Sequence, residues 1–160
     1  MQNAITGIND HLLAHLQRSL EKAKEIRIIV AFLMESGAKL IADQLAAAAG
    51  RGVPIKILTG TYLSVTEPSA IYCLKSRLGE AAEIRFYKDP IRSFHPKAYI
   101  FEHDDDGEIY IGSSNLSKAA LTDGVEWNYR LTRSLAPEDY ARFVRTFDEL
   151  FAHHSYVVDE

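Results

Sequence analysis

His95-Pro96-Lys97 begins an apolar, strand-like run, and Gly112-Ser113-Ser114-Asn115 follows the next run of that kind along the chain. Residues two apart in an extended segment project from the same face. His95 and Lys97 therefore present an imidazole and an ammonium group together, while Ser113 and Asn115 present a hydroxyl and an amide. The two motifs thus offer four chemically useful side chains on two extended segments.

Glu126 completes a set of groups that suits the cleavage of a phosphodiester. That reaction needs a nucleophile, a proton for the leaving oxygen, and donors for the charge on the non-bridging oxygens. His95 supplies the nucleophile or acid–base group, and the carboxylate of Glu126 can accept from its far nitrogen and orient it. The phosphate oxygens would be bound by the other three side chains, Lys97, Ser113 and Asn115. The sequence therefore predicts an enzyme, specifically a nuclease, that needs no metal ion.

The residues from Ser93 to Asn128 resemble the HKD signature of the phospholipase D superfamily, in which His-any-Lys, four residues and Asp precede Gly-Ser-any-Asn. Glu126 lies eleven residues past Asn115, as the corresponding Glu does in single-motif nucleases of that superfamily. The resemblance implies a covalent phosphohistidine intermediate on His95. The Asp of the signature is Glu102 here, at a position that in the family supports packing rather than chemistry.

A longer part of the chain is similar to the phospholipase D-like domains at the N-terminus of some DEAD/DEAH-box helicases and restriction systems. In those domains a Thr-Gly-any-Tyr loop precedes the motif and a Glu-Trp-Asn triplet follows it, and the matching segments here are Thr59–Tyr62 and Glu126–Asn128. The similarity implies DNA as the substrate and a fused or associated helicase as a partner. We expect residues 1–160 to be a single phospholipase D-like domain, either complete or the N-terminal module of a longer protein.

One imidazole cannot be deprotonated for attack and protonated for the leaving group in the same step. No other histidine of the sequence lies in a comparable setting. A symmetric homodimer that places two copies of His95 across one phosphate resolves this conflict, and the resemblance implies the same pairing. A neutral and a protonated imidazole acting together predict a bell-shaped dependence of the rate on pH.

The composition is that of a globular protein, since 47% of the 160 residues are hydrophobic, 25% are charged, and the net charge is −4. No window has the uninterrupted apolar length of a membrane span, and the N-terminus lacks the basic start and apolar stretch of a signal peptide. The single cysteine, Cys73, excludes an internal disulfide and suits a reducing cytoplasm, where we expect the protein to reside. We expect its thiol to be buried filler.

Three further residues, Arg92, Ser114 and Tyr62, are candidates for binding the substrate. Ser114 either adds a hydrogen bond or faces away from the site, and Tyr62 either touches a base or sugar or packs within its own loop. Arg92 belongs to a short stretch of cations, which either holds a phosphate backbone or consists of solvated loop charges. The other members of this stretch are Arg85, Lys88 and Lys97.

Neither group of potential metal ligands predicts a metal site. Asp104–Asp106 is the only dense acidic cluster, but its spacing fits no calcium loop and it occupies a hairpin turn. His11 and His15 have a spacing that can hold zinc, but no third ligand is evident. We therefore expect neither a metal nor any other cofactor.

The periodicity of the apolar residues predicts an α/β fold. Helices are expected over residues 9–24, 37–49, 66–79 and 117–121 and from Pro137 onward, and strands over residues 26–33, 53–59, 82–87, 95–102, 108–112 and 124–131. Early alternation of strands and helices and a late hairpin indicate a mixed, mostly parallel β-sheet flanked by helices on both faces, the phospholipase D-like fold. Trp127 and Tyr129 alternate with polar residues, so we expect them in the core rather than stacked on bases.

Two other functions remain open on the same fold. A catalytically silent copy would bind nucleic acid or mediate dimerisation within a helicase or restriction protein. Phosphatidyl transfer on lipid is the other, although the sequence lacks an amphipathic segment with a basic polar face for binding membranes. A plasmid-nicking assay in chelator, with a His95→Ala control, distinguishes the nuclease from the silent module.

Overall fold

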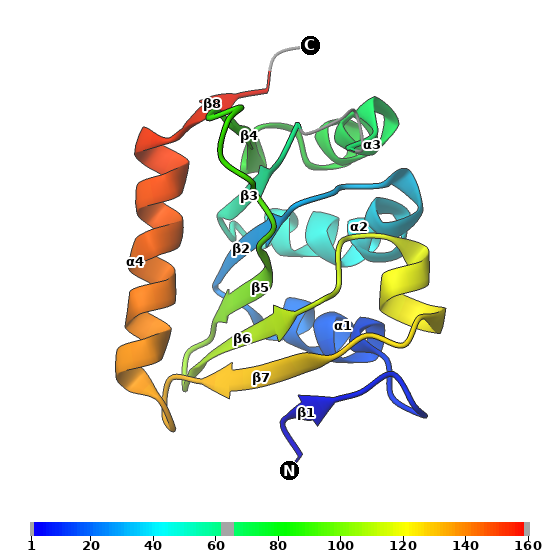
Figure 1. Cartoon of the computed structure of the whole chain (residues 1–160), viewed down its shortest axis with the longest axis vertical. Helices are drawn as coiled ribbons and strands as arrows, with labels where there is room; N and C mark the ends of the chain where they lie inside the picture. Colours follow the sequence, from blue (N-terminus) through cyan, green and yellow to red (C-terminus); the bar gives the residue numbers. More distant parts are fainter. Residues whose placement is uncertain (1, 62–65, 159–160) are drawn as a thin grey trace.

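The computed structural model describes residues 2–61 and 66–158, and in them eight strands form one sheet with helices on both faces (Figure 1). The α-helices are α1 (Leu12–Lys22), α2 (Glu35–Gly50), α3 (Pro68–Leu78) and α4 (Pro137–His153). A 3₁₀-helix, Gly79–Ala81, follows α3, and a π-helix, Ala119–Asp123, lies two residues later than the short helix predicted over residues 117–121. The strands are β1 (Ala4–Ile5), β2 (Glu25–Val30), β3 (Ile55–Thr59), β4 (Ala82–Tyr87), β5 (Lys97–Glu102), β6 (Gly107–Gly112), β7 (Asn128–Thr132) and β8 (Ser155–Val157). Their order across the sheet is β1-β7-β6-β5-β2-β3-β4-β8.

Five of the seven strand pairings are antiparallel, and only β2–β3 and β3–β4 are parallel. Parallel neighbours need a crossover connection, which α2 and α3 provide. The predicted mixed sheet with helices on both faces is confirmed, but the prediction that it is mostly parallel is wrong. The early alternation of strands and helices accounts for two pairings only, and the later strands all pair antiparallel.

The two faces of the sheet carry separate apolar clusters. Helices α1, α2 and α3 cover one face, where Ile28 and Leu45 are among the fully buried side chains. Helix α4 covers the other face with a side that includes Tyr140 and Phe147. The predicted apolar stripe of this helix runs through Phe143, Phe147, Leu150 and Phe151. Phe143 is nevertheless 40% exposed, and the buried side of the helix begins with Tyr140 instead.

Two predicted helix caps have other roles. The sequence predicts Asn9 as the cap of the first helix, but Asn9 has a φ of 63° and the helix starts at Leu12. The carboxylate of the next residue, Asp10, accepts from two N–H groups of the preceding loop. The sequence also predicts Ser36 as the cap of α2, but its hydroxyl accepts from the N–H of Lys118. The side chains of Asp10 and Ser36 therefore hold loops rather than helix ends.

The edge strands β1 and β8 are absent from the predicted elements, because strands of two and three residues are too short for alternation to appear. The sequence predicts a frayed helix end at His153 and His154. Instead, the carbonyl oxygen of His154 accepts from the N–H of Lys88 at 3.0 Å, where the chain enters β8. Cys73 on α3 is half-buried and packs against the larger apolar cluster.

The prediction that Trp127 and Tyr129 lie in the core is wrong, since their exposed fractions are 72% and 52%. Strand β7 begins only at Asn128, and its outer neighbour is the two-residue β1. The apolar cluster under α4 includes Leu131 but neither of the two aromatic residues. Alternation along a strand predicts burial of one face only if another layer covers that face, and here α4 covers just the far part of β7.

Candidate active site

Both sequence motifs lie at one end of the sheet. Strands β2, β3 and β6 end there and β5 and β7 begin there, since Val30 pairs with Lys97 and Gly112 pairs with Asn128. His95–Lys97 lead into β5, Ser113–Asn115 follow β6, and Glu126 lies just before β7. The fold therefore brings the loops that carry the five predicted chemical side chains to the same end of the sheet.

Ser113 joins the loops after β6 and before β7. Its hydroxyl donates to the carboxylate of Glu126 and accepts from the N–H of Trp127 at 3.0 Å. Its own N–H donates to the carbonyl oxygen of Trp127, also at 3.0 Å. Gly112 permits this approach, because a Cβ there would lie 2.0 Å from the same carbonyl oxygen. Glu126 thus accepts from Ser113, and its predicted contact with His95 stays a prediction.

Buried side chains support the loop Ser113–Asn115. Ser114 is fully buried; its hydroxyl accepts from Nδ2 of Asn128 at 2.8 Å, and its carbonyl oxygen accepts from the Tyr99 hydroxyl at 3.0 Å. Burial, and then the charge of Glu126, raises the pKa of Tyr99 well above its ordinary value, so its hydroxyl remains a donor. Ser114 therefore faces inward, which does not fit a contact with substrate. In the sequence, only the Glu-Trp-Asn triplet, which ends at Asn128, indicates that buried side chains support this loop.

Asn115 has its amide fixed in one orientation. Its Oδ1 accepts from the N–H of Phe32, just past β2, at 2.9 Å. A backbone N–H can only donate, so the amide oxygen must face Phe32 and the Nδ2 group must point elsewhere. Nδ2 is therefore the end of this side chain that can bind an anion at the site.

His95 and Lys97 lie where β5 begins. Phe94 is buried and stacks on Tyr87 with ring centroids 4.6 Å apart, which anchors the segment before His95. His95 itself is exposed, and the half-buried Lys97 donates from Nζ to the carbonyl oxygen of His95 at 2.7 Å. The imidazole is thus accessible to another molecule, and the ammonium group of Lys97 lies beside the main chain of the same residue.

The other predicted substrate contacts differ in their positions. Arg92 is exposed, and its N–H donates to the carboxylate of Asp89 at 3.3 Å in the loop that precedes the motif. Arg85, from the same stretch of cations, donates to the Ser155 hydroxyl at 2.7 Å on β8. The four cations therefore do not act as one phosphate-binding face. Tyr62 lies outside the described residues.

Glu102 occupies the position of the signature's Asp. It lies at the end of β5 far from the candidate site and contacts α4. Its carboxylate accepts from the Tyr140 hydroxyl at 2.6 Å and pairs with Arg133. Glu102 and His95 lie at opposite ends of β5. The contacts of Glu102 therefore support packing, the role that the resemblance implies.

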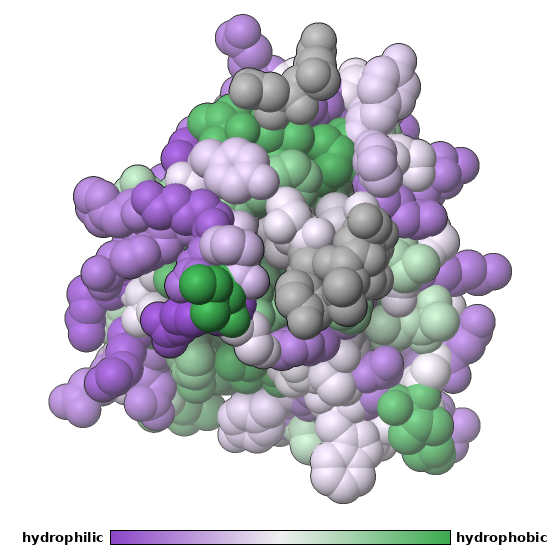
Figure 2. All heavy atoms as spheres, turned by 45° about the horizontal axis from the view of Figure 1, so that its top comes forward, coloured by the Kyte–Doolittle hydropathy of each residue, from purple (hydrophilic) through white to green (hydrophobic). Residues whose placement is uncertain are grey.

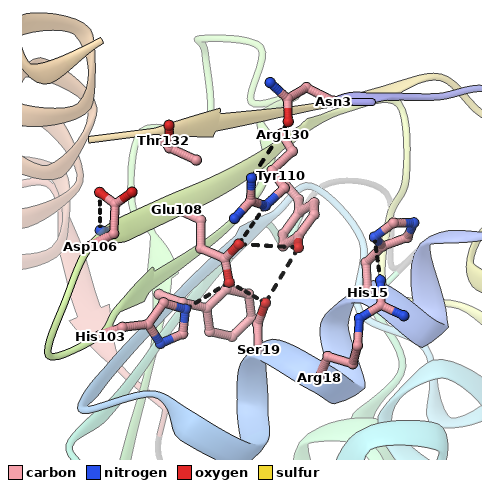
Figure 3. Close-up of polar contacts among 12 residues, drawn as sticks. Asn3, His15, Arg18, Ser19, His103, Asp106, Glu108, Tyr110, Arg130 and Thr132 are labelled. Atoms are coloured by element: carbon pink, nitrogen blue, oxygen red, sulfur yellow. Dashed lines mark hydrogen bonds and ion pairs between the residues drawn. The ribbon is translucent and has the colours of Figure 1, made fainter. Parts of the chain in front are cut away.

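A buried polar network lies at the same far end and centres on Glu108, which is 3% exposed (Figure 3). Its carboxylate accepts from Nε2 of His103 and Nε of Arg130, both at 2.6 Å. It also accepts from the hydroxyls of Ser19 on α1 and Tyr110. Burial alone would raise the pKa of this carboxyl, but hydrogen bonds from His103, Ser19 and Arg130 lower it to about 2. The network holds α1 to the sheet and is separate from the candidate site.

A cavity of about 630 Å³ opens between α3 and β4. Its lining includes Ile71, Tyr72 and Phe86, and Figure 2, which brings the α3–β8 side forward, shows apolar atoms exposed there among hydrophilic ones. None of the five predicted chemical residues lines this cavity. It is therefore not the candidate active site.

Potential metal ligands are dispersed in the part of the chain that the structure describes, where no three His, Cys, Asp or Glu side chains gather closely enough to hold an ion. Asp106 of the acidic turn accepts from the Ser134 hydroxyl at 2.7 Å, and Arg18 donates to Nδ1 of His15 at 2.9 Å. Within residues 2–61 and 66–158, the helices also lack the combination of length and hydropathy that a bilayer crossing requires.

Comparison with protein families gives one match across most of the chain. Residues 16–154 match the profile of the family described as cardiolipin synthase, PLD-like domain. The matched range contains His95, Lys97, the loop Ser113–Asn115 and Glu126. A comparison with curated proteins found no match.

Several solved structures share the fold. NucT from Helicobacter pylori has a TM-score of 0.73 at 18% identity, over 92% of this chain and 91% of that one. Phosphatidylserine synthase from Haemophilus influenzae has a TM-score of 0.63 at 17% identity, over 96% of this chain and 38% of that one. TrmBL2, an archaeal chromatin protein with a novel mode of DNA binding, has a TM-score of 0.57 at 20% identity, over 91% of this chain and 50% of that one. At such identities the likeness extends to the fold alone.

Proposed function

This chain belongs to the phospholipase D-like family, and from that premise we propose that it is a metal-independent nuclease that cleaves the phosphodiester bonds of DNA. The observation that carries the proposal is the position of Asn115, whose Oδ1 accepts from the N–H of Phe32, so that its Nδ2 is the end that can bind a phosphate, at the end of the sheet where His95 and Lys97 also lie. An imidazole, an ammonium group and an amide donor meet the requirements of attack on a phosphate. We propose that residues 1–160 act as one cytoplasmic domain, alone or as a module of a helicase or restriction protein.

In the proposed reaction, a ring nitrogen of His95 attacks phosphorus and forms a phosphohistidine as the bond to the leaving oxygen breaks. The leaving oxygen takes its proton from His95 of the partner subunit. Water then attacks the phosphohistidine and gives a proton to that second imidazole, which restores both rings. Lys97 and Nδ2 of Asn115 stabilise the charge on the non-bridging oxygens throughout.

The role of Ser113 in this reaction depends on its hydrogen bond to Glu126. In the free protein the Ser113 hydroxyl donates to the Glu126 carboxylate, so its proton is not available to a phosphate. Binding of a phosphate oxygen by Ser113 requires the hydroxyl to turn away from the carboxylate. Glu126 is then free to accept from His95, which is the contact that the sequence predicts.

Replacing Asn115 by Asp should lower kcat/KM by about a hundredfold or more. Asp keeps an oxygen for the N–H of Phe32, but it exchanges the donor end for an acceptor and adds a negative charge facing the phosphate. Loss of one preorganised donor costs about 100- to 1,000-fold in kcat. Cleavage of a labelled oligonucleotide measures the change, and circular dichroism verifies the fold. Asn115→Ala, which adds no charge, should be less damaging, and wild-type activity in Asn115→Asp would contradict the role given to Nδ2.

The proposed homodimer predicts that an inactive subunit disables an active one. If both imidazoles act on one phosphate, a mixed dimer of wild type and His95→Asn has a single imidazole and cannot complete the reaction. After subunit exchange with a roughly ninefold excess of His95→Asn protein, cleavage per wild-type chain should fall about tenfold, because about a tenth of wild-type chains then pair with one another. Unchanged cleavage per wild-type chain, with exchange verified by pull-down of tagged subunits, would show that each subunit has a complete site.

The nuclease activity itself is tested by incubating plasmid and oligonucleotide DNA with the purified protein in the presence of a chelator. Cleavage by the wild type and none by His95→Asn supports the proposal. Activity that disappears in chelator and returns with magnesium contradicts the metal-independent mechanism. Turnover of phosphatidylcholine vesicles without cleavage of DNA would favour phosphatidyl transfer instead.

A second candidate is a catalytically silent module that binds nucleic acid. The shared fold with TrmBL2, a chromatin protein that binds DNA, favours this alternative. The alternative predicts that wild type and His95→Asn bind DNA with equal affinity and that neither cleaves it. A gel-shift assay run beside the cleavage assay separates the two functions.

A further inference from the structure

Trp127 and Tyr129 form an exposed aromatic surface beside the candidate active site. The two side chains are 72% and 52% exposed, and residues two apart in an extended segment lie on the same face. Together with Ala4, Ile5 and Ile111 they line a cavity of about 330 Å³. None of the residues around this cavity carries a charge.

The main chain of Trp127 is part of the candidate site. Its N–H donates to the hydroxyl of Ser113 and its carbonyl oxygen accepts from the N–H of Ser113, both at 3.0 Å. The preceding residue, Glu126, accepts from the same hydroxyl. The main chain of Trp127 is therefore bonded directly to Ser113, one of the groups that would hold the scissile phosphate.

Large apolar side chains that are exposed together mark an interaction surface. The rings of Trp and Tyr offer flat apolar faces with an N–H or O–H at the edge, and unpaired bases stack on such faces. Asp10 lines a neighbouring cavity with Tyr129, but its carboxylate already accepts from the N–H groups of Thr6 and Gly7. The surface thus offers stacking partners and little charge that would repel a phosphate backbone.

We propose that Trp127 and Tyr129 stack on unpaired bases next to the scissile phosphate, so that the protein acts on single-stranded nucleic acid in preference to duplex. The inference rests on the proposed nuclease function and specifies its substrate class. Bases of a duplex already stack on one another, so their faces are not available to an aromatic side chain. In this proposal, a strand whose phosphate lies against Lys97 and Asn115 continues across the start of β7, where its next bases meet the indole.

Trp127 is the only tryptophan of the chain, so its fluorescence reports on this surface alone. The test uses His95→Asn protein, which leaves the oligonucleotide intact, with a short single-stranded oligothymidylate and a duplex of the same length as probes. The single strand should quench the fluorescence and bind at least about tenfold more tightly than the duplex. Adding Trp127→Ala should weaken binding of the single strand about tenfold or more, measured by anisotropy of the labelled oligonucleotide, and Trp127→Phe should retain most of the affinity.

Tyr72→Ala is the matched control, because Tyr72 on α3 is 76% exposed and lies away from the site; it should leave binding unchanged. Equal affinity for single strand and duplex, unaffected by Trp127→Ala, overturns the proposal even if cleavage persists, and the nuclease function then stands. If the single strand quenches the fluorescence but the wild type does not cleave it, the stacking surface is supported and the nuclease function is contradicted. If Trp127→Ala converts a dimer to a monomer in sedimentation equilibrium, the surface binds a second copy of the chain and the proposal is wrong.

Discussion

Replacing His95 by Asn should lower kcat for phosphodiester cleavage by at least about a thousandfold, because catalytic groups that act as a unit lose most of the rate when any one is removed. Asn keeps a polar side chain of similar size but has no nitrogen that can attack phosphorus, so no phosphohistidine forms. Single-turnover cleavage of a labelled oligonucleotide measures the rate. Acid-labile phosphate trapped on the wild-type protein should be absent from the variant.

His153→Asn is the control for this experiment, since His153 is exposed at the end of α4, away from both motifs. It should keep wild-type activity. His95 is also exposed, so His95→Asn should unfold at the same temperature as the wild type, and its loss of activity cannot then be attributed to unfolding. More than a tenth of the wild-type rate in a nuclease-free His95→Asn preparation would refute the proposed nucleophile.

Replacing Glu108 by Ala should lower the free energy of unfolding by about 3 kcal/mol. The substitution removes the acceptor that His103, Ser19 and Arg130 share, and breaking a buried ion pair on one side costs about 3–5 kcal/mol. The side chain of Arg130 is 20% exposed, and this partial solvation keeps the cost at the lower end of that range. Urea denaturation at neutral pH measures the change. Glu21→Ala on the exposed side of α1 should cost less than about 0.5 kcal/mol.

The same carboxylate predicts how stability depends on pH. The pKa of Glu108 is about 2 in the folded protein, against an ordinary value of 4.5 for a glutamate side chain. A depressed pKa means that the ionised form stabilises the fold, so this contribution is fully present above about pH 4.5 and is lost as the pH falls toward 2. Over that interval the free energy of unfolding of the wild type should fall by about 3 kcal/mol more than that of Glu108→Ala. Parallel stability curves for the two proteins would contradict the role of the network.

The sequence predicts those parts of the fold and site that depend on local rules. The strand over residues 82–87 has the predicted bounds, and α3 begins at Pro68, because a proline at the first helical position and β-branched or aromatic runs are local signals. The motifs around His95 and Ser113 lie at one end of the sheet because a short hairpin joins their strands. Consecutive antiparallel strands bring the start of one beside the end of the next.

Contacts between distant segments could not be predicted in the same way. The orientation of Asn115 depends on the N–H of Phe32, and the burial of Ser114 depends on Tyr99 and Asn128. The alternating pattern around Trp127 is that of a half-buried strand, but burial also requires a covering layer, and only the tertiary structure shows where α4 lies. The direction of the strand pairings likewise follows from the order of strands across the sheet, which no local pattern specifies.

The outermost strands, β1 and β8, have consequences for how the protein associates. They are two and three residues long, so each of these strands offers few free amide and carbonyl groups to another polypeptide. Long, flat margins allow sheets of separate molecules to join into fibrils, and very short outer strands suppress that growth. Pairing of strands between molecules is therefore disfavoured, which suits association through side-chain surfaces into a closed pair rather than a filament.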